Sequence, residues 1–251
     1  MKIISWNVNG IRSTHGFIDN IHRLDPDIVC LQEIKADATQ LPQLAGYQLF
    51  VNSANKKGYS GVVIYTRIKP LSSRTDLGLT QFDDEGRFIE LTYNNWTLIN
   101  IYIPHGGRDK SKLDYKLEVY QRLQTQLKEL KDDKVIIVGD FNVAHNDIDV
   151  CRAKQNHKNT MFTDIERTQI NNIIQFGFID AFRLLHDEAN NFTWWPYAYE
   201  ARKRNIGWRI DYTFINNFKF ELIGAKILNQ ITGSDHCPIE IELDIDRYNK
   251  K

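Results

Sequence analysis

The stretch IVGDFNVAH, residues 137–145, ends a run of aliphatic residues with a carboxylate at Asp140 and an amide at Asn142. Because side chains alternate along a strand, positions 140 and 142 would leave the sheet on the same face. Asp, Asn and Gly are also common turn residues, so this stretch alone fits an ordinary loop after a strand. The rest of the chain has to decide between a plain loop and a functional site.

Similar runs rich in Ile, Val, Tyr and Phe recur along the chain, and several alternate with polar residues as half-buried strands do. Two of them flank Asn94 and Asn95, which predicts a hairpin that turns at this pair. The predicted strands are KIISWNV (2–8), DIVCLQEI (27–34), GVVIYTR (61–67), RFIELTY (87–93), WTLINIYI (96–103), KVIIVGDF (134–141), RIDYTFI (209–215) and CPIEIELDI (237–245).

Three segments between these runs have helical patterns. Residues 163–177 begin with a capping box formed by Thr163 and Glu166, and Gly177 suits the end of that helix. A weaker helix is predicted for about residues 16–24. Residues 111–130 form the third helix, with Ser111 as its N-cap. Its buried stripe has a spacing of three to four residues: Leu113, Leu117, Tyr120, Leu123, Leu127 and Leu130.

Helices therefore interleave with strands throughout, and no linker, low-complexity segment or internal repeat divides the chain. This pattern predicts one α/β domain, residues 1–251, in which mixed sheets pack face to face with helices outside. A chain of 251 residues is long enough to bury a substantial core. The pattern does not specify which strands pair.

Composition narrows the class of protein. No apolar run approaches the roughly 20 residues that span a bilayer, and the N-terminus lacks the apolar region of a signal peptide. Cys30, Cys151 and Cys237 are too scattered for a disulfide framework, which favours a reducing, cytoplasmic location, nucleoid-associated in a prokaryote. The net charge is zero, so a polyanionic partner would have to meet a local basic patch.

Polar side chains recur where the predicted strands end. Each occurrence alone is most simply a turn or a loop, but together they are harder to dismiss. Carboxylates beside apolar strands are costly unless they are paired or bind a metal. Catalytic groups also gather on loops at strand ends. The six segments contribute Asn7 and Asn9, Glu33, Tyr102 and His105, Asp140 and Asn142, Asp211, and Asp235 and His236.

These residue types indicate a chemistry. Carboxylate and amide oxygens, without a Cys/His cluster, favour a hard cation such as Mg²⁺ over zinc. A histidine with nearby aspartates offers an oriented imidazole whose charged form is stabilised. Together they suit the attack of water on a phosphodiester, because negative charge develops on oxygen in that transition state.

The motifs SWNVNGIR, LQEIK, YIPHGGR, GDFNVAH, GWRIDY and GSDHCPI occur in this order. Together they resemble the exonuclease III family of abasic-site endonucleases, within the wider endonuclease/exonuclease/phosphatase superfamily. The resemblance runs from Lys2 to about Leu243. GWRIDY, and the spacing from GDFNVAHNDIDV to Asn156 and Asn159, indicate the DNA-repair branch.

The resemblance implies a four-layer α/β sandwich, with two packed mixed sheets flanked by helices. It also implies Mg²⁺-dependent hydrolysis 5′ to abasic sites in duplex DNA, with Mn²⁺ as a substitute cation. Members commonly add 3′→5′ exonuclease activity and trimming of blocked 3′ ends, as phosphodiesterase or phosphatase. We expect a monomer that acts on duplex DNA and does not bind membranes.

The resemblance also implies roles for single residues. Glu33 would be the main metal ligand, with Asn7, Asn9 and Asp235 lining the metal site. Asp140 would orient or deprotonate the attacking water, and Asn142 would hold Asp140 and the phosphate. His236, steadied by Asp211, would bind the scissile phosphate, and Tyr102 would contact phosphate or assist the leaving oxygen. The resemblance leaves open whether Asp140 or His236 is the base.

Basic loops at 55–61, 105–112, 151–159 and 199–209 would supply phosphate contacts, although each also fits solvated surface. Within the resemblance, Trp194 and Trp208 form the pocket for the flipped-out abasic sugar, whereas Trp195 is expected in the core. Further DNA contacts are expected from Arg12, Lys35, His105, Arg108, Asn156 and Asn159.

Two positions depart from the family pattern. His105 stands where close relatives often carry Asn or Gln, so the charge of this phosphate contact would depend on pH. Asn9 replaces the Asp of some relatives, which removes a negative charge from the metal site.

Two alternatives remain beside a DNA-repair enzyme. One is a phosphodiesterase of the same superfamily that acts on RNA tails, inositol phosphates or phospholipid headgroups. The other is a DNA-binding protein that has kept the fold and lost catalysis, although the catalytic set is complete in this sequence.

Overall fold

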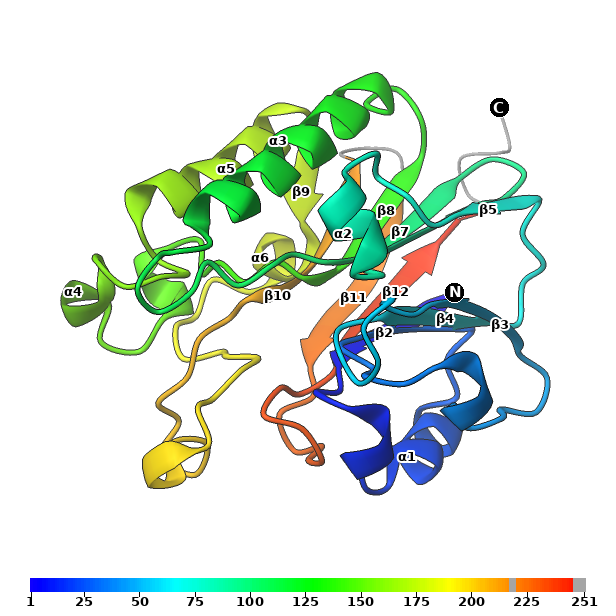
Figure 1. Cartoon of the computed structure of the whole chain (residues 1–251), viewed down its shortest axis with the longest axis horizontal. Helices are drawn as coiled ribbons and strands as arrows, with labels where there is room; N and C mark the ends of the chain where they lie inside the picture. The colour runs from blue at the N-terminus through cyan, green and yellow to red at the C-terminus, as the bar shows by residue number, and fades with distance from the viewer. Residues whose placement is uncertain (217–219, 246–251) are drawn as a thin grey trace.

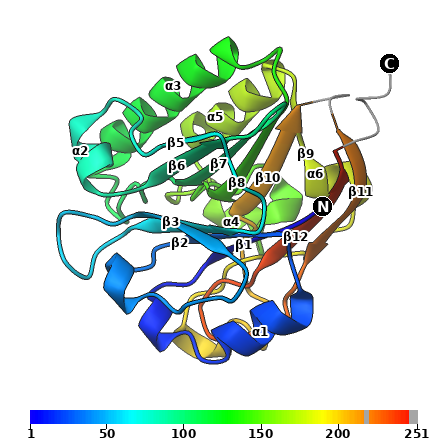
Figure 2. The ribbon, with the colours of Figure 1, turned by 90° about the vertical axis from the view of Figure 1, so that its right-hand side faces the viewer.

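The computed structural model describes residues 1–216 and 220–245. Its strands form two six-stranded sheets, which lie face to face between layers of helices and loops (Figure 2). Sheet A has the order β11 (Glu221–Ile227), β12 (Ile239–Asp244), β1 (Lys2–Asn7), β2 (Ile28–Gln32), β4 (Val62–Thr66), β3 (Gln48–Asn52). Sheet B has the order β5 (Ser72–Arg74), β6 (Phe88–Thr92), β7 (Thr97–Tyr102), β8 (Val135–Asp140), β10 (Asp211–Asn216), β9 (Phe178–Asp180).

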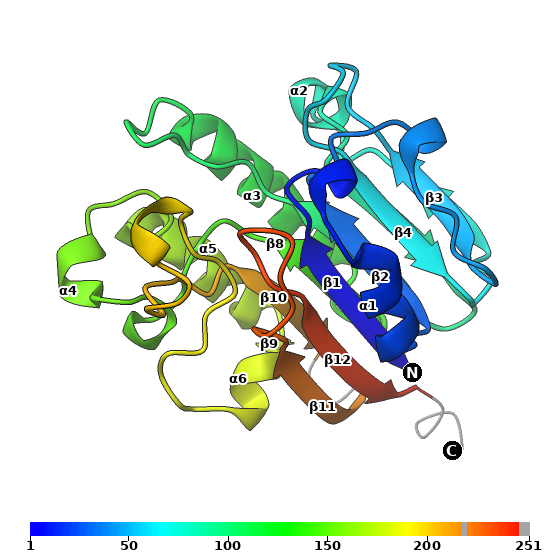
Figure 3. The same cartoon turned by 90° about the horizontal axis from the view of Figure 1, so that it is seen from below.

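Helices cover the outer face of each sheet (Figures 1 and 3). The long helices α3 (Leu113–Glu129) and α5 (Asp164–Gln175) pack on sheet B, and α1 (Phe17–Leu24) packs on sheet A. The parallel pairs β1–β2 and β7–β8 are each joined through one of these helices, α1 and α3. The shorter elements are α2 (Thr80–Asp84), α4 (Ala153–Asn156), α6 (Ala181–Leu185), η1 (Ile11–Ser13), η2 (Ala38–Gln40), η3 (Asp147–Asp149) and η4 (Ala198–Glu200).

Alternation along the strands builds three apolar layers. In β1, Ile3 faces the other sheet while Ile4 packs under α1. In β8, Ile136 faces sheet A and Ile137 faces α3 and α5. Because both faces of β8 are covered, all six of its residues are buried, which explains its uninterrupted apolar sequence. The predicted four-layer α/β sandwich with two mixed sheets is confirmed.

Local predictions have mixed outcomes. The hairpin is confirmed, since β6 and β7 pair with Thr92 opposite Thr97. The capping box of Thr163 and Glu166 is also confirmed at the start of α5. Ser111 as an N-cap is wrong: α3 begins at Leu113 without a side-chain cap, and Ser111 instead bonds to the Asp109 carboxylate. Short or irregular strands β3, β5, β9 and β11 were not predicted.

One basic residue of the 199–209 segment is part of the core. Arg209 is 1% exposed, and its guanidinium lies 2.8 Å from Asp149 Oδ1 and 2.7 Å from Asp180 Oδ2. Arg183 adds a second guanidinium 2.5 Å from Asp149. The prediction that this segment supplies DNA contacts is therefore wrong for Arg209, because paired burial keeps its charge from solvent.

Asp149→Asn is expected to lower the free energy of unfolding by about 3 kcal/mol, because it leaves buried guanidinium charge uncompensated. Burial alone would raise the pKa of Asp149, but Arg209 and Arg183 outweigh it and lower that pKa. The stabilisation is therefore present above the unfolded-state pKa of about 4 and is lost as pH falls through the folded-state value. Urea unfolding at pH 7 should show the full difference, and acidification should close it.

The matched control for this prediction is Asp147→Asn, because the Asp147 side chain is 58% exposed and only loosely paired with Arg167. It should cost less than about 0.5 kcal/mol. Equal losses for the two variants would mean that the buried pairing contributes nothing special.

No helix in the described part of the chain is both long and apolar enough to cross a membrane.

Candidate active site

Three polar residues form one cross-strand row at the end of sheet B. Tyr102 at the end of β7 lies opposite Asp140 at the end of β8, and Asp140 lies opposite Asp211 at the start of β10. Neighbours in register point to the same side of a sheet. Pairing of three strands thus brings together residues that are up to 109 positions apart in sequence, from Tyr102 to Asp211.

Sheet A brings a second group to the same place. Asn7 ends β1, and its Nδ2 donates to Asp140 Oδ2 at 2.9 Å and to Glu33 Oε2 at 3.2 Å. Glu33 directly follows β2 and has a positive φ of 54°. This unusual backbone for a non-glycine residue turns the chain at the sheet edge. One amide therefore links carboxylates from the two sheets.

Asp140 is the most heavily hydrogen-bonded carboxylate of the site. It is 1% exposed and accepts from the Asn142 backbone N–H at 2.8 Å, from Asn142 Nδ2 at 3.2 Å and from Asn7. Burial and the nearby Asp211 charge raise the pKa of Asp140 to about 7, although His236 opposes this. Asn142 has a φ of 51°, so the turn returns its amide to the carboxylate two residues earlier. A carboxylate held in this way can orient a water or accept its proton.

His236 and Asp211 form a buried hydrogen-bonded pair. His236 Nδ1 lies 2.9 Å from Asp211 Oδ2, and His236 Nε2 lies 4.0 Å from Asp140 Oδ2. Burial alone would lower the pKa of His236, but the charge and hydrogen bond of Asp211 outweigh it and raise the pKa to about 10. The imidazole is therefore held in its charged form, with Nε2–H directed towards the site, where it can donate to an anionic oxygen.

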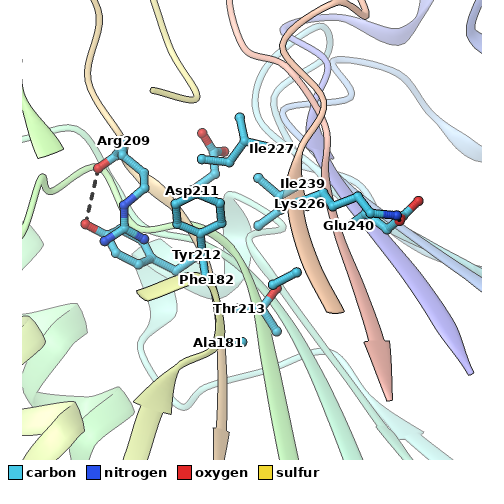
Figure 4. A pocket seen from close by; sticks show the side chains of 11 residues that line it. Ala181, Phe182, Arg209, Asp211, Tyr212, Thr213, Lys226, Ile227, Ile239 and Glu240 are labelled. Carbon is cyan, nitrogen blue, oxygen red and sulfur yellow. Dashed lines mark hydrogen bonds and ion pairs between the residues drawn. The ribbon is translucent and has the colours of Figure 1, made fainter. Parts of the chain in front are cut away.

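The space behind this pair does not extend the site. A cavity of about 10 Å³ lies between Asp211, α6, β11 and β12, and its walls are mainly apolar (Figure 4). That volume barely accommodates one water molecule. Among the described residues, Asp211 Oδ1 has no hydrogen-bond partner. The carboxylate therefore interacts with His236 through Oδ2.

Oxygen atoms on sheet A already converge on a cationic group. Lys35 Nζ lies 2.9 Å from Glu33 Oε1 and 2.5 Å from Asn9 Oδ1, and Asn9 Nδ2 donates to Asp235 Oδ1 at 2.9 Å. Carboxylate and amide oxygens without a thiolate suit a hard divalent cation. The residues predicted to line a metal site therefore lie together: Glu33, Asn9 and Asp235 supply oxygen atoms that fit such an ion. Asn7 directs its Nδ2 to Glu33, while its Oδ1 accepts from the Asn9 backbone N–H.

Distances alone also allow a metal site formed by Asp140, Asp211 and His236. One ligand atom of each residue lies within 4.8 Å of the other two. We favour a catalytic pair over this arrangement, because His236 Nδ1 and Asp211 Oδ2 are already engaged with each other at 2.9 Å.

Tyr102 is supported from one side by a cation. It is 8% exposed, and the Arg87 guanidinium stacks 4.3 Å from its ring centroid while bonding to the hydroxyl of Tyr59. Burial, and next Glu33, raise the pKa of Tyr102 well above its ordinary value. The phenol therefore stays protonated and can act as a hydrogen-bond donor.

Two tryptophans form a wall beside the pair of Asp211 and His236. Trp194 Nε1 donates to Asp235 Oδ2 at 3.0 Å, and its ring lies 6.4 Å from that of His236. Trp208 meets Trp194 edge-on at 6.5 Å. The structure thus places both predicted pocket residues next to the site. Trp195 is 3% exposed, which confirms its predicted place in the core.

The structure also shows the surroundings of the other residues that were predicted to contact DNA. Arg12 is exposed and reaches the Lys35 carbonyl at 3.5 Å, and Arg108 is exposed on the loop after β7. Asn159 Nδ2 donates to Asn156 Oδ1, and Asn156 Nδ2 donates to the backbone carbonyls of Cys151 and Arg152.

The surroundings of His105 bear on its charge, which the sequence analysis expected to depend on pH. Its Nδ1 accepts from the Gly107 N–H at 3.0 Å, which leaves Nε2 as the protonated nitrogen of the neutral ring. Burial, and next Lys116, lower the pKa of His105, so the ring is neutral near pH 7. A neutral donor can replace the amide of relatives without adding charge.

Sequence analysis missed two residues near the site. Lys116 is completely buried, with Nζ 2.7 Å from the Asn142 carbonyl and 2.6 Å from Glu166. Its partners lie 26 and 50 positions away in the sequence, so no local pattern indicated its burial. Tyr197 is 76% exposed and contacts Asn9 beside Asp235. The nearest sequence signal was the basic segment 199–209 with its aromatic residues, which begins two positions after Tyr197.

Comparison with known proteins identifies relatives of this chain. The model of the Endonuclease/Exonuclease/phosphatase family matches residues 4–236. Among curated proteins, the chain is 38% identical over 252 residues to the exodeoxyribonuclease of Bacillus subtilis, covering 98% of this chain and all of that protein. It is 37% identical to the DNA repair nuclease APEX1 of Danio rerio, covering 98% of this chain and 83% of that protein.

Solved structures show the same likeness. The 3′ phosphatase from Neisseria bound to a product DNA hairpin superposes with a TM-score of 0.89 at 28% identity. An AP endonuclease from Archaeoglobus fulgidus superposes with a TM-score of 0.87 at 28% identity. Each comparison covers 97% of this chain and 99% of the other.

Proposed function

This chain belongs to the Endonuclease/Exonuclease/phosphatase family, and we propose that it is a DNA-repair nuclease that cuts duplex DNA 5′ to abasic sites. The observation that carries the proposal is the Asn7 amide, which bonds to both Glu33, the proposed metal ligand, and the buried Asp140, the proposed catalytic carboxylate. We further propose that residues 1–251 act as one domain and as a monomer. Exonuclease activity and trimming of blocked 3′ ends would use the same site.

The chain's own residues divide the work on one phosphate. Asp140, held by Asn142, orients the attacking water and accepts its proton or passes it on. His236, kept charged by Asp211, donates through Nε2 to a phosphate oxygen on which negative charge grows. Tyr102 donates its phenolic hydrogen bond to phosphate or to the leaving oxygen. Because His236 keeps its proton, Asp140 is the base in this arrangement.

Glu33, Asn7, Asn9 and Asp235 would hold Mg²⁺, with Mn²⁺ as a substitute. Bound there, the cation supplies positive charge to the reacting phosphate and its leaving oxygen. Glu33 is 20% exposed at its side chain, so the site remains open to a substrate oxygen as a catalytic metal site requires.

Recognition of the lesion would rest on the tryptophan wall. Trp194 lies beside His236 and Trp208 packs edge-on against Trp194, so the two rings would enclose a sugar that carries no base. Extruding a nucleotide costs least where a base is already missing, so the pocket selects abasic DNA partly through that energy. Arg12, Lys35 and Arg108, together with neutral His105, would bind backbone phosphates, and Asn156 and Asn159 would contact DNA farther along.

A labelled duplex with one abasic analogue, incubated with Mg²⁺ or with EDTA, tests the proposal. We expect Mg²⁺-dependent nicking 5′ to the analogue and none in EDTA. Hydrolysis of RNA or lipid phosphodiesters without nicking would instead identify a phosphodiesterase with another substrate. Tight duplex binding without any hydrolysis would identify a DNA-binding protein that has lost catalysis.

Glu33→Gln is expected to raise the Mg²⁺ concentration for half-maximal activity at least about tenfold, because it removes the main anionic ligand and keeps the shape. Calorimetric titration of the DNA-free protein with Mn²⁺ should show the same weakening. Glu118→Gln, on the exposed face of α3, is the matched control and should change neither value. Unchanged cation binding in Glu33→Gln would remove Glu33 from the metal site.

A further inference from the structure

The two halves of the candidate active site belong to different sheets. Asn7 and Glu33 come from sheet A, whereas Tyr102 and Asp140 come from sheet B. The facing surfaces of the sheets are largely aliphatic. Apolar burial stabilises contact but is non-directional, so it does not by itself fix how one sheet is placed on the other.

A buried polar network crosses this apolar interface. Asn100 of β7 accepts at Oδ1 from Gln32 Nε2 of β2 at 2.7 Å. Through Nδ2, Asn100 donates to the carbonyls of Leu31 at 3.1 Å and Val63 at 3.0 Å. Gln32 Nε2 also donates to Ser5 Oγ of β1 at 3.0 Å. Every hydrogen bond of the Asn100 amide therefore joins sheet B to sheet A.

The three residues of this network come one or two positions before active-site residues along the chain. Their side chains are at most 2% exposed. Residues two positions apart on a strand point to the same face and are separated by roughly 7 Å. Each member precedes a residue of the site by one or two positions: Ser5 precedes Asn7, Gln32 precedes Glu33, and Asn100 precedes Tyr102.

We propose that Ser5, Gln32 and Asn100 are positioning residues, which fix the register of the two sheets and thereby the Asn7–Asp140 contact. The inference deepens the proposed function and rests on it, because the contact matters for catalysis only if the site hydrolyses phosphodiesters. None of the three residues would touch the substrate or the cation.

The energetics of the network fit a positioning role better than a stabilising one. Buried amides need partners in one geometry, whereas aliphatic side chains of similar volume would pack with less directional demand. Within the described residues, Gln32 Oε1 is buried without a hydrogen-bond partner, which is a cost in stability. Hydrogen bonds between the sheets that come with this cost in stability are better explained by a role in placing one sheet relative to the other.

Replacing both amides, in Gln32→Leu/Asn100→Leu, separates placement from stability. Removing both partners together with apolar groups of similar size can be nearly neutral for stability. We expect Tm within a few degrees of the wild type, kcat on the abasic duplex reduced at least about tenfold, and KM changed less than about threefold. Small misplacements within a catalytic site have effects of this size.

Leu91→Ala is the matched control, because Leu91 is buried in the same interface without a polar contact. Leu91→Ala should lower Tm and leave kcat at 20 °C unchanged. If the amides had a merely structural role, the double variant would show this same result. If the double variant does not fold, Gln32→Met, which keeps the length and removes the amide, carries the same test.

A crystal structure of the variant provides a readout that needs no activity. We expect the distance from Asn7 Nδ2 to Asp140 Oδ2 to increase beyond hydrogen-bond reach from 2.9 Å. Wild-type kcat together with an intact contact would overturn the inference. Failure of the wild type to cut any DNA would overturn the proposed function instead, and the crystallographic distance would still decide whether the network positions the sheets.

Discussion

Asp140→Asn is expected to reduce nicking of the abasic duplex by at least about 10³-fold, while duplex affinity stays within about threefold of the wild type. The variant keeps the volume of the side chain but loses the charge that orients or deprotonates water. An amide at this position can also accept from Asn142 and Asn7 only through its single oxygen, whereas the carboxylate uses both. Single-turnover nicking and a fluorescence binding assay measure the two quantities.

Asp19→Asn is the control for Asp140→Asn, because Asp19 is exposed on α1, which packs on the outer face of sheet A. It should change neither nicking nor binding. An equal loss of binding and nicking in Asp140→Asn would assign Asp140 to DNA affinity and contradict its role in the chemical step. A fall in Tm that accounts for the loss would also contradict it.

The second large effect is expected for Asp211→Asn. The Asp211 carboxylate accepts from His236 Nδ1 at 2.9 Å and is the main cause of the raised pKa of about 10. Without that charge, the pKa of His236 should fall towards the ordinary value of about 6.5, so the ring is neutral at pH 8. We expect kcat at pH 8 to fall roughly 10²- to 10⁴-fold.

The pH dependence identifies the cause of this loss. A raised pKa means that wild-type His236 stays charged as pH increases through neutrality and loses its proton only near pH 10. Asp211→Asn should therefore lose its remaining activity at a much lower pH than the wild type on the alkaline side. Titration of the His236 ring by NMR measures the same shift directly. An unchanged titration would show that Asp211 does not hold the imidazole charge.

On the acidic side of the pH profile, activity should be lost because of Asp140 rather than His236. Burial and Asp211 raise the pKa of Asp140 to about 7, so its carboxylate is lost as pH falls through that value. Because a neighbouring divalent cation favours the ionised form, bound Mg²⁺ would move this loss to lower pH.

The local features of the fold could be predicted from sequence because their causes are local. Runs rich in β-branched and aromatic residues marked strands such as β1, and a fully apolar run marked β8, which is covered on both faces. The capping box at Thr163 depends on Glu166, only three residues away. The same logic failed for Ser111, where Asp109 competes for the hydroxyl and the helix begins two residues later.

The types of residue in the site could also be predicted from the residues themselves, whereas partners such as Asp211 for His236 came only from the family resemblance. A carboxylate after an apolar strand suggested Asp140, yet nothing near it in sequence indicates that Asn7 donates to it across 133 positions. Nothing near Lys116 indicated its burial, and Arg209 was expected in a DNA-contacting loop. Their burial depends on Glu166 and Asp149, which other segments bring to them.

The sequence by itself determined the longer regular strands, where they end and which chemical groups stand at those ends, because periodicity, caps and turns act between near neighbours. Only the tertiary structure decided that Tyr102, Asp140 and Asp211 share one row, that His236 reaches Asp211, and that amides tie the two sheets together. Those relations follow from strand pairing and sheet packing, which depend on the whole chain burying its apolar surface at once.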